Sequence, residues 1–376
     1  MLAIERALIV FIILSIVSLL ADITYEGARS ISGPYLELLG ASLIIAGGVS
    51  VGELLSYAFR FIGGIVAFRL ASSLAYWSLL ILGYIINLVA VPLLAFAGSW
   101  EVAFALYMVE RIGKGFRVPI RDTIIAEVST GVGRGKGFAI HEFLDQIGAL
   151  VGPLIVAYTI TSTGGSYSMA LLILGIPAML SIVALFTASA MYPKIRSASR
   201  IEGGGARILP RGFYLACLAV GLAMFSFIHW GQASYIAFSL GWKNVALLYA
   251  LAMAIDGLVS IPLGVAYDSL GPRILLVIPI ATLLSTIALS HGNILVFILL
   301  WGIAMGALEV LPKAIVAELV DERARSLAYS ILFLSMGLGW TLGNITLAYL
   351  TLESTLSLIL VLVASLASMA IILRLR

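Results

Sequence analysis

The chain consists of long continuous apolar runs, each about the length of a membrane crossing, joined by short links such as Gly98-Ser99 and Gly164-Gly165-Ser166. A transmembrane helix needs about 20 predominantly apolar residues, whereas the strands of a transmembrane β-barrel alternate apolar and polar residues. The pattern therefore predicts an all-α membrane protein with twelve transmembrane helices. The expected spans are residues 4–32, 41–69, 72–97, 100–129, 134–161, 166–190, 212–239, 243–268, 272–290, 293–319, 325–350 and 354–373.

The composition agrees with a lipid environment. Hydrophobic residues make up 62% of the 376 residues and charged residues 11%, whereas a soluble domain has about 45–50% apolar and about 25% charged residues. The one cysteine, Cys217, falls in an apolar run, so we expect no disulfide framework, no metal site and no cofactor. The apolar run from Leu8 to Ala21 continues into a charged stretch without a cleavage site, so it is interpreted as a helix and not as a signal peptide.

Two stretches of the chain repeat at a constant separation. Residues 134–153 read RGKGFAIHEFLDQIGALVGP, and residues 325–344 read RSLAYSILFLSMGLGWTLGN. A shift of 191 aligns Arg134 with Arg325, Phe138 with Tyr329, Gly148 with Gly339 and Gly152 with Gly343. An internal repeat of a multi-helix apolar unit is typical of transporters.

The longest link, from Tyr192 to Arg211, contains three consecutive glycines and two prolines and carries one acid, Glu202, against five bases. These bases are Lys194, Arg196, Arg200, Arg207 and Arg211. Such a segment is typical of a flexible linker. We therefore expect an N-terminal six-helix bundle over residues 1–191, a basic linker over residues 192–211 and a C-terminal six-helix bundle over residues 212–376.

The basic residues near the helix ends fall almost entirely on one side of the predicted membrane. The side that contains the linker holds fourteen, and the opposite side holds Lys243. The fourteen are the five linker bases and Arg6, Arg69, Arg134, Lys136, Arg273, Arg323, Arg325, Arg374 and Arg376. Because cytoplasmic loops carry the excess of lysine and arginine, we expect a multi-pass protein of the cell membrane with both termini and the linker in the cytoplasm.

Short motifs in the chain resemble those of the major facilitator superfamily. The link between the eighth and ninth predicted helices reads Gly264-Val-Ala-Tyr-Asp268-Ser-Leu-Gly271-Pro-Arg273, which is similar to the G-x-x-x-D-x-x-G-x-R loop signature of that superfamily. At the equivalent point between the second and third helices, Phe68 stands in the place of the acid.

Two further elements carry the resemblance. The sequence RIGKG, from Arg111, resembles the R-x-x-Q-G element of the fourth helix, with a lysine at the glutamine position. The sequence GALVGP, from Gly148, resembles the first part of the antiporter motif, although the following Gly-Gly is absent. The resemblance implies two pseudo-symmetric six-helix bundles that rock about a central site, with the first and fourth helices lining the cavity on the N-terminal side.

Thirteen ionisable side chains fall inside the predicted helices of the first half, whereas the second half has few. A charge at mid-bilayer costs about 2.5–3.5 kcal/mol on insertion scales, so these groups must face one another or a water-filled cavity. The set comprises Asp22, Glu26, Arg29, Glu53, Arg60, Glu110, Arg111, Lys114, Arg117, Arg121, Asp122, Glu142 and Asp145. The first half is therefore expected to carry charge recognition, and the second half to supply aromatic and amide contacts.

Helical spacing groups these residues into faces, since residues three or four apart share one side of a helix. The expected faces are Asp22, Tyr25, Glu26 and Arg29 on the first helix, Glu53, Tyr57 and Arg60 on the second, Glu110, Lys114, Arg117 and Arg121 on the fourth, and His141, Glu142 and Asp145 on the fifth. The expected substrate- and proton-binding residues are Asp22, Tyr25, Glu26, Arg29, Glu53, Tyr57, Arg60, Glu110, Arg111, Lys114, Arg117, Glu142 and Asp145. Arg121 and Asp122 are expected to act in gating, together with Gly264, Asp268 and Arg273 of the loop motif.

A carboxylate that gains and loses a cationic partner can release and take up a proton. Two groupings fit this switch. They are Glu26 or Asp22 with Arg29, and Glu142 or Asp145 with Arg111 or Lys114.

These features predict a secondary active transporter and not an enzyme; neither an H-E-x-x-H motif nor a pair of catalytic aspartates is found. We expect alternating access with proton coupling, a small charged or amphipathic solute and, from the GALVGP element, export. An uptake symporter for an organic anion, a passive channel and a lipid scramblase are the alternatives. The expected partners are the solute, protons and membrane lipids, with no nucleic acid, and a monomer suffices because the repeat lies within one chain.

Overall fold

The computed structural model describes residues 2–70, 72–192, 194–195, 209–321 and 324–375, and this part of the chain is helical without a strand. It forms two compact units. The first comprises Met1–Ile31 and Leu55–Glu202, and the second comprises Ser32–Leu54 and Gly203–Arg376. Residues 196–208 of the predicted linker lie outside the described residues.

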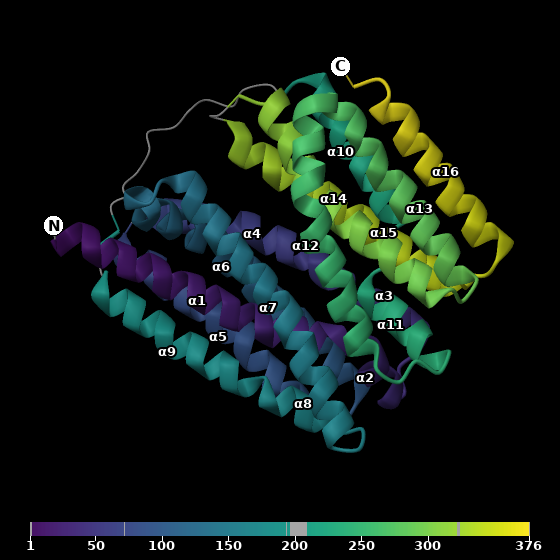
Figure 1. Cartoon of the computed structure of the whole chain (residues 1–376), viewed down its shortest axis with the longest axis horizontal. Coiled ribbons are helices and arrows are strands. Elements are labelled where there is room, and N and C mark those ends of the chain that lie inside the picture. The colour runs from purple at the N-terminus through teal and green to yellow at the C-terminus, as the bar shows by residue number, and fades with distance from the viewer. Residues whose placement is uncertain (1, 71, 193, 196–208, 322–323, 376) are drawn as a thin grey trace. The chain divides into compact units, whose positions relative to one another are not determined.

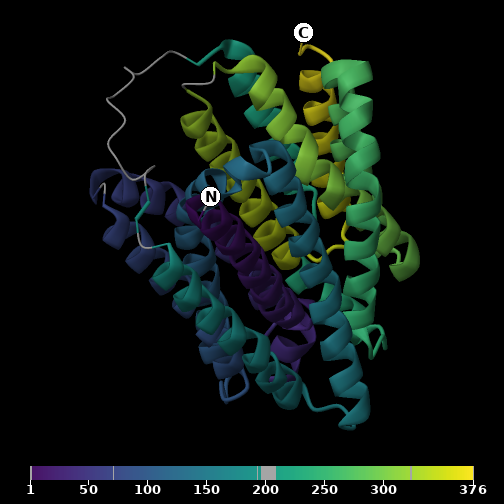
Figure 2. The ribbon, with the colours of Figure 1, turned by 60° about the vertical axis from the view of Figure 1, so that its left-hand side comes forward.

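The first unit is a bundle of long helices in which sequence neighbours and distant segments both pack together. Its helices are α1 (Leu2–Ser30), most of α4 (Val51–Leu70), α5 (Ser73–Leu94), α6 (Trp100–Val128), α7 (Arg134–Ser162), α8 (Tyr167–Ile173) and α9 (Gly175–Met191), with the short turn η1 (Ser129–Gly131). Helix α1 packs against α7 and α9, and α5 packs against α6 (Figure 1). The run of α1 beside α9 is visible again in the rotated view (Figure 2).

The second unit contains the later helices and one short segment from early in the chain. Its later helices are α10 (Arg211–Phe225), α11 (Trp230–Ser239), α12 (Val245–Leu270), α13 (Val277–Ser290), α14 (Ile294–Leu319), α15 (Arg325–Leu350) and α16 (Thr355–Ile372), with the short turn η3 (Gly271–Leu276). Helix α12 packs against α14, and α10 packs against α15 and α16.

The early segment of this unit, residues 32–54, includes α2 (Ser32–Leu38), α3 (Leu43–Gly48) and the first turn of α4. It lies against α11 and α15. The Gly33 amide donates to Ser234 Oγ at 3.1 Å, and Thr341 Oγ1 donates to the Ser50 carbonyl at 3.2 Å. Compactness thus groups this segment with the later helices. The predicted six-helix bundles over residues 1–191 and 212–376 stay a prediction.

Ten helical stretches of the described chain are long and apolar enough to cross a membrane. One of them, Val245–Ser290, has 46 residues and contains α12, η3 and α13, which is enough for two crossings. Helix α6 is too rich in charge to belong to this set, but its 29 residues extend about 44 Å. Each of the twelve predicted spans matches a helix or a pair of consecutive helices, so the predicted all-α membrane fold is confirmed.

The internal repeat corresponds to two equivalent helix contacts. In the first unit, Gly152 of α7 lies against the Ile23 carbonyl of α1, and in the second unit Gly343 of α15 lies against the Phe225 carbonyl of α10. At both positions the neighbouring backbone leaves no room for a Cβ atom. Glycine at the two aligned positions therefore allows the same close helix approach in each unit.

Candidate charge-switch site

Helices α1 and α6 carry polar side chains that meet in reverse order along their length. We call this set of contacts the polar ladder. Its three rungs are Glu26 with Lys114, Tyr25 with Arg117, and Ser18 with Arg121. Since the residue number rises on α1 as it falls on α6, the two helices are antiparallel here. The ladder extends about 12 Å along α1, because eight residues separate Ser18 from Glu26 and each adds about 1.5 Å.

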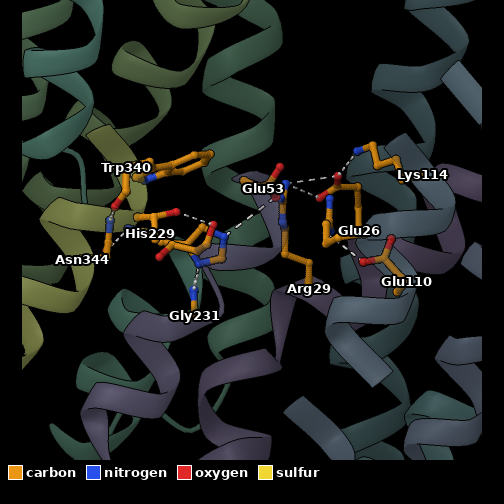
Figure 3. A network of polar contacts seen from close by, with 12 residues as sticks. Glu26, Arg29, Glu53, Glu110, Lys114, His229, Gly231, Trp340 and Asn344 are labelled. Carbon is orange, nitrogen blue, oxygen red and sulfur yellow. Dashed lines mark hydrogen bonds and ion pairs between the residues drawn. The ribbon is translucent and has the colours of Figure 1, made fainter. Parts of the chain in front are cut away.

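At the Glu26 rung, one carboxylate is held by two cations (Figure 3). Glu26 Oε1 lies 3.4 Å from Arg29 Nη1 and 3.5 Å from Lys114 Nζ. The side chains of Glu26 and Arg29 are 7% and 9% exposed, and that of Lys114 is 22% exposed. Charge-assisted hydrogen bonds are typically about 2.7–2.9 Å long, so both cations hold Glu26 loosely.

A tighter ion pair lies beside this rung. Arg111 Nε lies 2.8 Å from Glu110 Oε2, and Asn87 Nδ2 of α5 donates to Glu110 Oε1 at 2.6 Å and to the Glu110 carbonyl at 3.1 Å. All three side chains are buried. The Asn87 amide therefore ties α5 to Glu110 of α6, and the short contact with Arg111 neutralises this carboxylate, in contrast to the loose contacts of Glu26.

The Tyr25 rung places an arginine between two aromatic rings. Tyr25 Oη donates to Asp22 Oδ1. The Arg117 guanidinium lies 4.1 Å from the centre of the Tyr84 ring and 5.7 Å from that of Tyr25. Arg117 is fully buried, and within the described chain none of its three guanidinium nitrogens has a hydrogen-bond partner. Stacking on aromatic faces is the direct stabilisation that this cation receives here.

The Ser18 rung is a network of four helices. Arg121 Nη1 donates to Ser18 Oγ at 3.3 Å and lies 3.4 Å from Asp145 Oδ2 of α7. His141 Nε2, also on α7, lies 3.5 Å from Ser18 Oγ and 3.6 Å from Asp145 Oδ2. Ser18 Oγ is also 3.3 Å from Tyr84 Oη of α5. A single serine on α1 therefore contacts a guanidinium, an imidazole and a phenol from three other helices.

A second polar site lies within the other unit, at the break between α10 and α11 (Figure 3). His229 Nδ1 accepts from the Gly231 amide at 3.1 Å, which leaves Nε2 as the protonated nitrogen in the neutral ring. That Nε2 lies 3.9 Å from Glu53 Oε1, and the Trp340 ring packs edge-on against the imidazole at 5.0 Å. The histidine thus both caps α11 and faces a buried carboxylate.

The backbone groups freed by this break are satisfied by side chains of three helices. Trp301 Nε1 donates to the Ile228 carbonyl at 2.9 Å, and Asn344 Nδ2 donates to the Phe227 carbonyl at 3.0 Å. The Asn344 amide oxygen accepts from the His229 amide at 2.7 Å, and Thr286 Oγ1 donates to Ser226 O at 2.5 Å. A broken helix inside a membrane requires such partners, so the break is a fixed feature of the second unit.

The family of the chain follows from sequence comparison. The profile of the Major Facilitator Superfamily matches residues 7–294. The chain belongs to the major facilitator superfamily. The uncharacterized protein Rv2265 of Mycobacterium tuberculosis is 35% identical over 366 residues, which cover 94% of this chain and 89% of that protein. The uncharacterized MFS-type transporter MJ1317 of Methanocaldococcus jannaschii is 26% identical over 283 residues, which cover 72% of this chain and 71% of that protein.

Solved structures of two transporters share the fold. The nucleoside transporter NupG superposes with a TM-score of 0.75 at 15% identity and covers 96% of this chain and 98% of its own. The peptide transporter POT in complex with sulfate superposes with a TM-score of 0.77 at 14% identity, covering 97% and 93%. The chain is therefore a multi-pass membrane protein of a transporter family, and at these identities the likeness concerns the fold alone.

In this superfamily member, most of the predicted first-half residues gather on the polar ladder, with one pairing that differs from expectation. Asp145 pairs with Arg121 and His141, not with Arg111 or Lys114, because it lies on the neighbouring α7 beside the Ser18 rung, two rungs from Lys114. Lys114 pairs instead with Glu26.

The remaining predicted residues lie apart from the rungs. Arg60 stacks on Tyr57 at 5.9 Å on α4, and Glu142 is exposed on α7. Gly264, Asp268 and Arg273 lie at the end of α12 and in η3, where Asp268 and Arg273 are exposed. Their gating role stays a prediction.

Sequence reasoning missed several uncharged partners of the charged groups. Ser18, Tyr84 and Asn87 were not singled out, although each bonds to a member of the site. Ser18 lies four residues before Asp22, on the same helical face, and this spacing was a usable signal. The two α5 residues carried no comparable signal because α5 has no ionisable face.

The letters GVSVG at residues 48–52 match the G-x-S-x-G pattern of serine hydrolases. That motif requires a strand-to-helix turn with an exposed serine. Here Ser50 lies between α3 and α4, is fully buried, and donates its hydroxyl to the Gly47 carbonyl at 2.7 Å. The local geometry is that of a helix junction and not of a nucleophile.

Proposed function

We propose that this protein is a proton-coupled secondary transporter that moves a small charged or amphipathic solute across the cell membrane by alternating access, with export as its direction. The observation that carries the proposal is the loose, buried contact of Glu26 with both Arg29 and Lys114. The protein works as a monomer, because the repeat lies within one chain. Both termini and the basic linker lie in the cytoplasm, following the distribution of basic residues along the chain.

Protonation of Glu26 is the coupling step. Two opposite unit charges 4 Å apart attract each other by about 4 kcal/mol at an effective dielectric constant of about 20. When Glu26 takes up a proton, Arg29 and Lys114 lose this attraction, and both cations become available for other partners. A change of this size is sufficient to shift an equilibrium between two conformations about a thousandfold, since 1.4 kcal/mol corresponds to about a factor of ten.

The tight pair Glu110–Arg111 has the complementary role of a scaffold. Its 2.8 Å contact neutralises Glu110, and the Asn87 amide joins this carboxylate to α5 next to the switch. Because this pair stays formed, protonation changes the partners of Glu26 without loosening the bundle.

One observation favours uptake of an organic anion as a second candidate function. At the Glu26 rung, the Lys114 side chain is 22% exposed and the Glu26 side chain is 7% exposed. A solute that reaches this rung meets an ammonium group before it meets the carboxylate. A solute carboxylate or phosphate can then replace Glu26 on Lys114 while Glu26 is protonated, which couples anion and proton movement in one direction.

The test begins with a thermal-shift screen of the purified protein against metal ions, sugars, organic anions and cationic drugs, since any binder stabilises the folded state by mass action. The stabilising compound is then added to proteoliposomes that contain a pH indicator. The proposal expects proton movement upon solute addition, in the same direction as the solute for symport and in the opposite direction for antiport.

Two outcomes contradict the proposal. Solute flux without any proton movement indicates a passive channel. Exchange of labelled lipids between the leaflets, without solute flux, indicates a scramblase.

A further inference from the structure

His229 is a titratable side chain of the second unit that the proposed coupling at Glu26 does not use. The residue is buried and lies directly before α11, in an extended backbone conformation. Its Nδ1 atom accepts a hydrogen bond at 3.1 Å from the Gly231 amide, the second amide of α11. A side chain in this position satisfies one of the amides that the start of a helix leaves without an intrahelical partner.

We propose that His229 is a proton-binding residue and that proton uptake at its Nδ1 atom releases the cap of α11. The inference goes beyond the proposed function, because it concerns the other unit and does not depend on proton coupling at Glu26. A proton from water takes the lone pair of Nδ1, the Nε2–H bond stays intact, and the ring gains one positive charge. The hydrogen bond from the Gly231 amide is the contact that is lost.

The first argument is that the cap and the protonated ring exclude each other. In the neutral ring, Nδ1 offers its lone pair to the Gly231 amide, and Nε2 carries the proton. In the imidazolium form both ring nitrogens carry a proton, and neither can accept a hydrogen bond. Two N–H groups would then face each other at the start of α11. The protonated ring therefore has to turn away from Gly231.

The second argument is that the protonated ring has an anion within reach. His229 Nε2 lies 3.9 Å from Oε1 of Glu53, a buried acid in the first turn of α4 (Figure 3). The positive end of α11 disfavours a cation at its N-terminus, whereas the carboxylate attracts it. Proton uptake thus exchanges the hydrogen bond from Gly231 for an ion pair with Glu53.

The other elements packed around His229 contribute groups whose charge does not change between acidic and neutral pH. Helix α15 supplies the Trp340 ring, which packs edge-on against the imidazole at 5.0 Å, and the Asn344 amide. Helix α14 supplies Trp301, which bonds to the residue before His229. Of these neighbours, Glu53 is the one that can pair with an imidazolium.

The release is confined to the first turn of α11. The backbone amide of His229 donates to Asn344 Oδ1 at 2.7 Å, and this contact does not involve the imidazole, so the break between α10 and α11 persists. Gly231 itself packs closely on α3, because a Cβ atom at this position would lie 2.8 Å from the Ala46 carbonyl oxygen. A shift of the first turn of α11 is therefore passed to α3 in the same unit.

The experiment is NMR spectroscopy of the full-length protein in lipid nanodiscs, with ¹⁵N-labelled histidine, over a range of pH. The chain has three histidines, His141, His229 and His291, and the variant H229N identifies the His229 signals by their loss. We expect His229 to be the Nε2–H tautomer at alkaline pH and the doubly protonated imidazolium at acidic pH.

The cap is followed at the Gly231 amide in a second labelled sample. Labelling tryptophan carbonyls with ¹³C and glycine nitrogens with ¹⁵N selects the Trp–Gly pairs of the chain, Trp230-Gly231 and Trp301-Gly302. Gly302 lies inside α14, so the exchange rate of Gly231 divided by that of Gly302 removes the general effect of pH on amide exchange. As His229 takes up its proton, this ratio should rise roughly tenfold, which corresponds to about 1.4 kcal/mol, the size of an N-cap contribution.

Two substitutions separate the cap from the proton site. In H229N, an amide oxygen replaces Nδ1 as the acceptor, and asparagine is a preferred N-cap residue that takes up no proton in this pH range. The ratio should therefore stay low at every pH. In H229Q, the amide lies one carbon farther from the backbone and glutamine is not a preferred N-cap residue, so the ratio should be high at every pH.

The proposal is overturned if the His229 ring stays neutral throughout the pH range in which the protein is folded, or if the imidazolium forms without a rise in the ratio. These two results come from the wild type, so the test stands even where a variant does not fold. A ratio that changes with pH in H229N or H229Q as it does in the wild type also overturns it. None of these results concerns Glu26, whose role is decided by the transport measurements.

Discussion

At the scale of the residue, the first unit keeps charges in a membrane by giving each one a different degree of neutralisation. Glu110 and Arg111 form a short pair with an added amide, Glu26 has two loose cations, and Arg117 has aromatic faces. The energetic cost of a buried charge depends on the partner that remains after a change. Substitutions on neighbouring positions of α6 should therefore have very different effects on stability.

Arg111→Met is expected to be strongly destabilising. It leaves Glu110 buried and without its cation, and removal of one partner of a buried pair costs about 3–5 kcal/mol. Lys114→Met should cost much less, because Glu26 keeps Arg29 at 3.4 Å. Denaturant unfolding in detergent micelles measures both, with Arg69→Met, an exposed base at the end of α4, as the control. Equal losses of unfolding free energy in Arg111→Met and Lys114→Met would show that the Glu110–Arg111 pair is no more important for stability than the contact of Lys114 with Glu26.

At the scale of the element, the α10–α11 break is held by side chains and not by the helix itself. Asn344 has a double role, because its amide group serves both the Phe227 carbonyl and the His229 amide. Sequence patterns cannot reveal this: residues 212–239 form one apolar run, and the partners come from α13, α14 and α15.

Asn344→Leu is expected to destabilise the second unit by about 1–3 kcal/mol for each backbone group that it leaves unsatisfied. Thr286→Val frees only the Ser226 carbonyl, so its effect should be about half as large. Thermal unfolding followed by intrinsic tryptophan fluorescence suits this test, since Trp301 and Trp340 lie at the break. A smaller loss for Asn344→Leu than for Thr286→Val would mean that Asn344 does not fix the break.

At the scale of the whole molecule, the sequence alone predicted the twelve spans and the concentration of charge in the first half. Both follow from hydropathy and helical spacing, which are local. The pairing of Asp145 with Arg121, the roles of Ser18 and Asn87, and the grouping of residues 32–54 with later helices were not predicted. Each depends on which helices lie side by side, which no local pattern encodes.

The measurement that tests the central claim most directly is solute transport by wild type and Glu26→Gln in proteoliposomes, with and without a pH gradient, using a compound that stabilises both proteins. Glu101→Gln, an exposed acid in the first turn of α6, is the control. The wild type and the control should accumulate or expel solute against its gradient when a pH gradient is imposed. Glu26→Gln should retain solute exchange but lose its response to pH. The account would be contradicted if a pH gradient drove as large a solute gradient in Glu26→Gln as in the wild type.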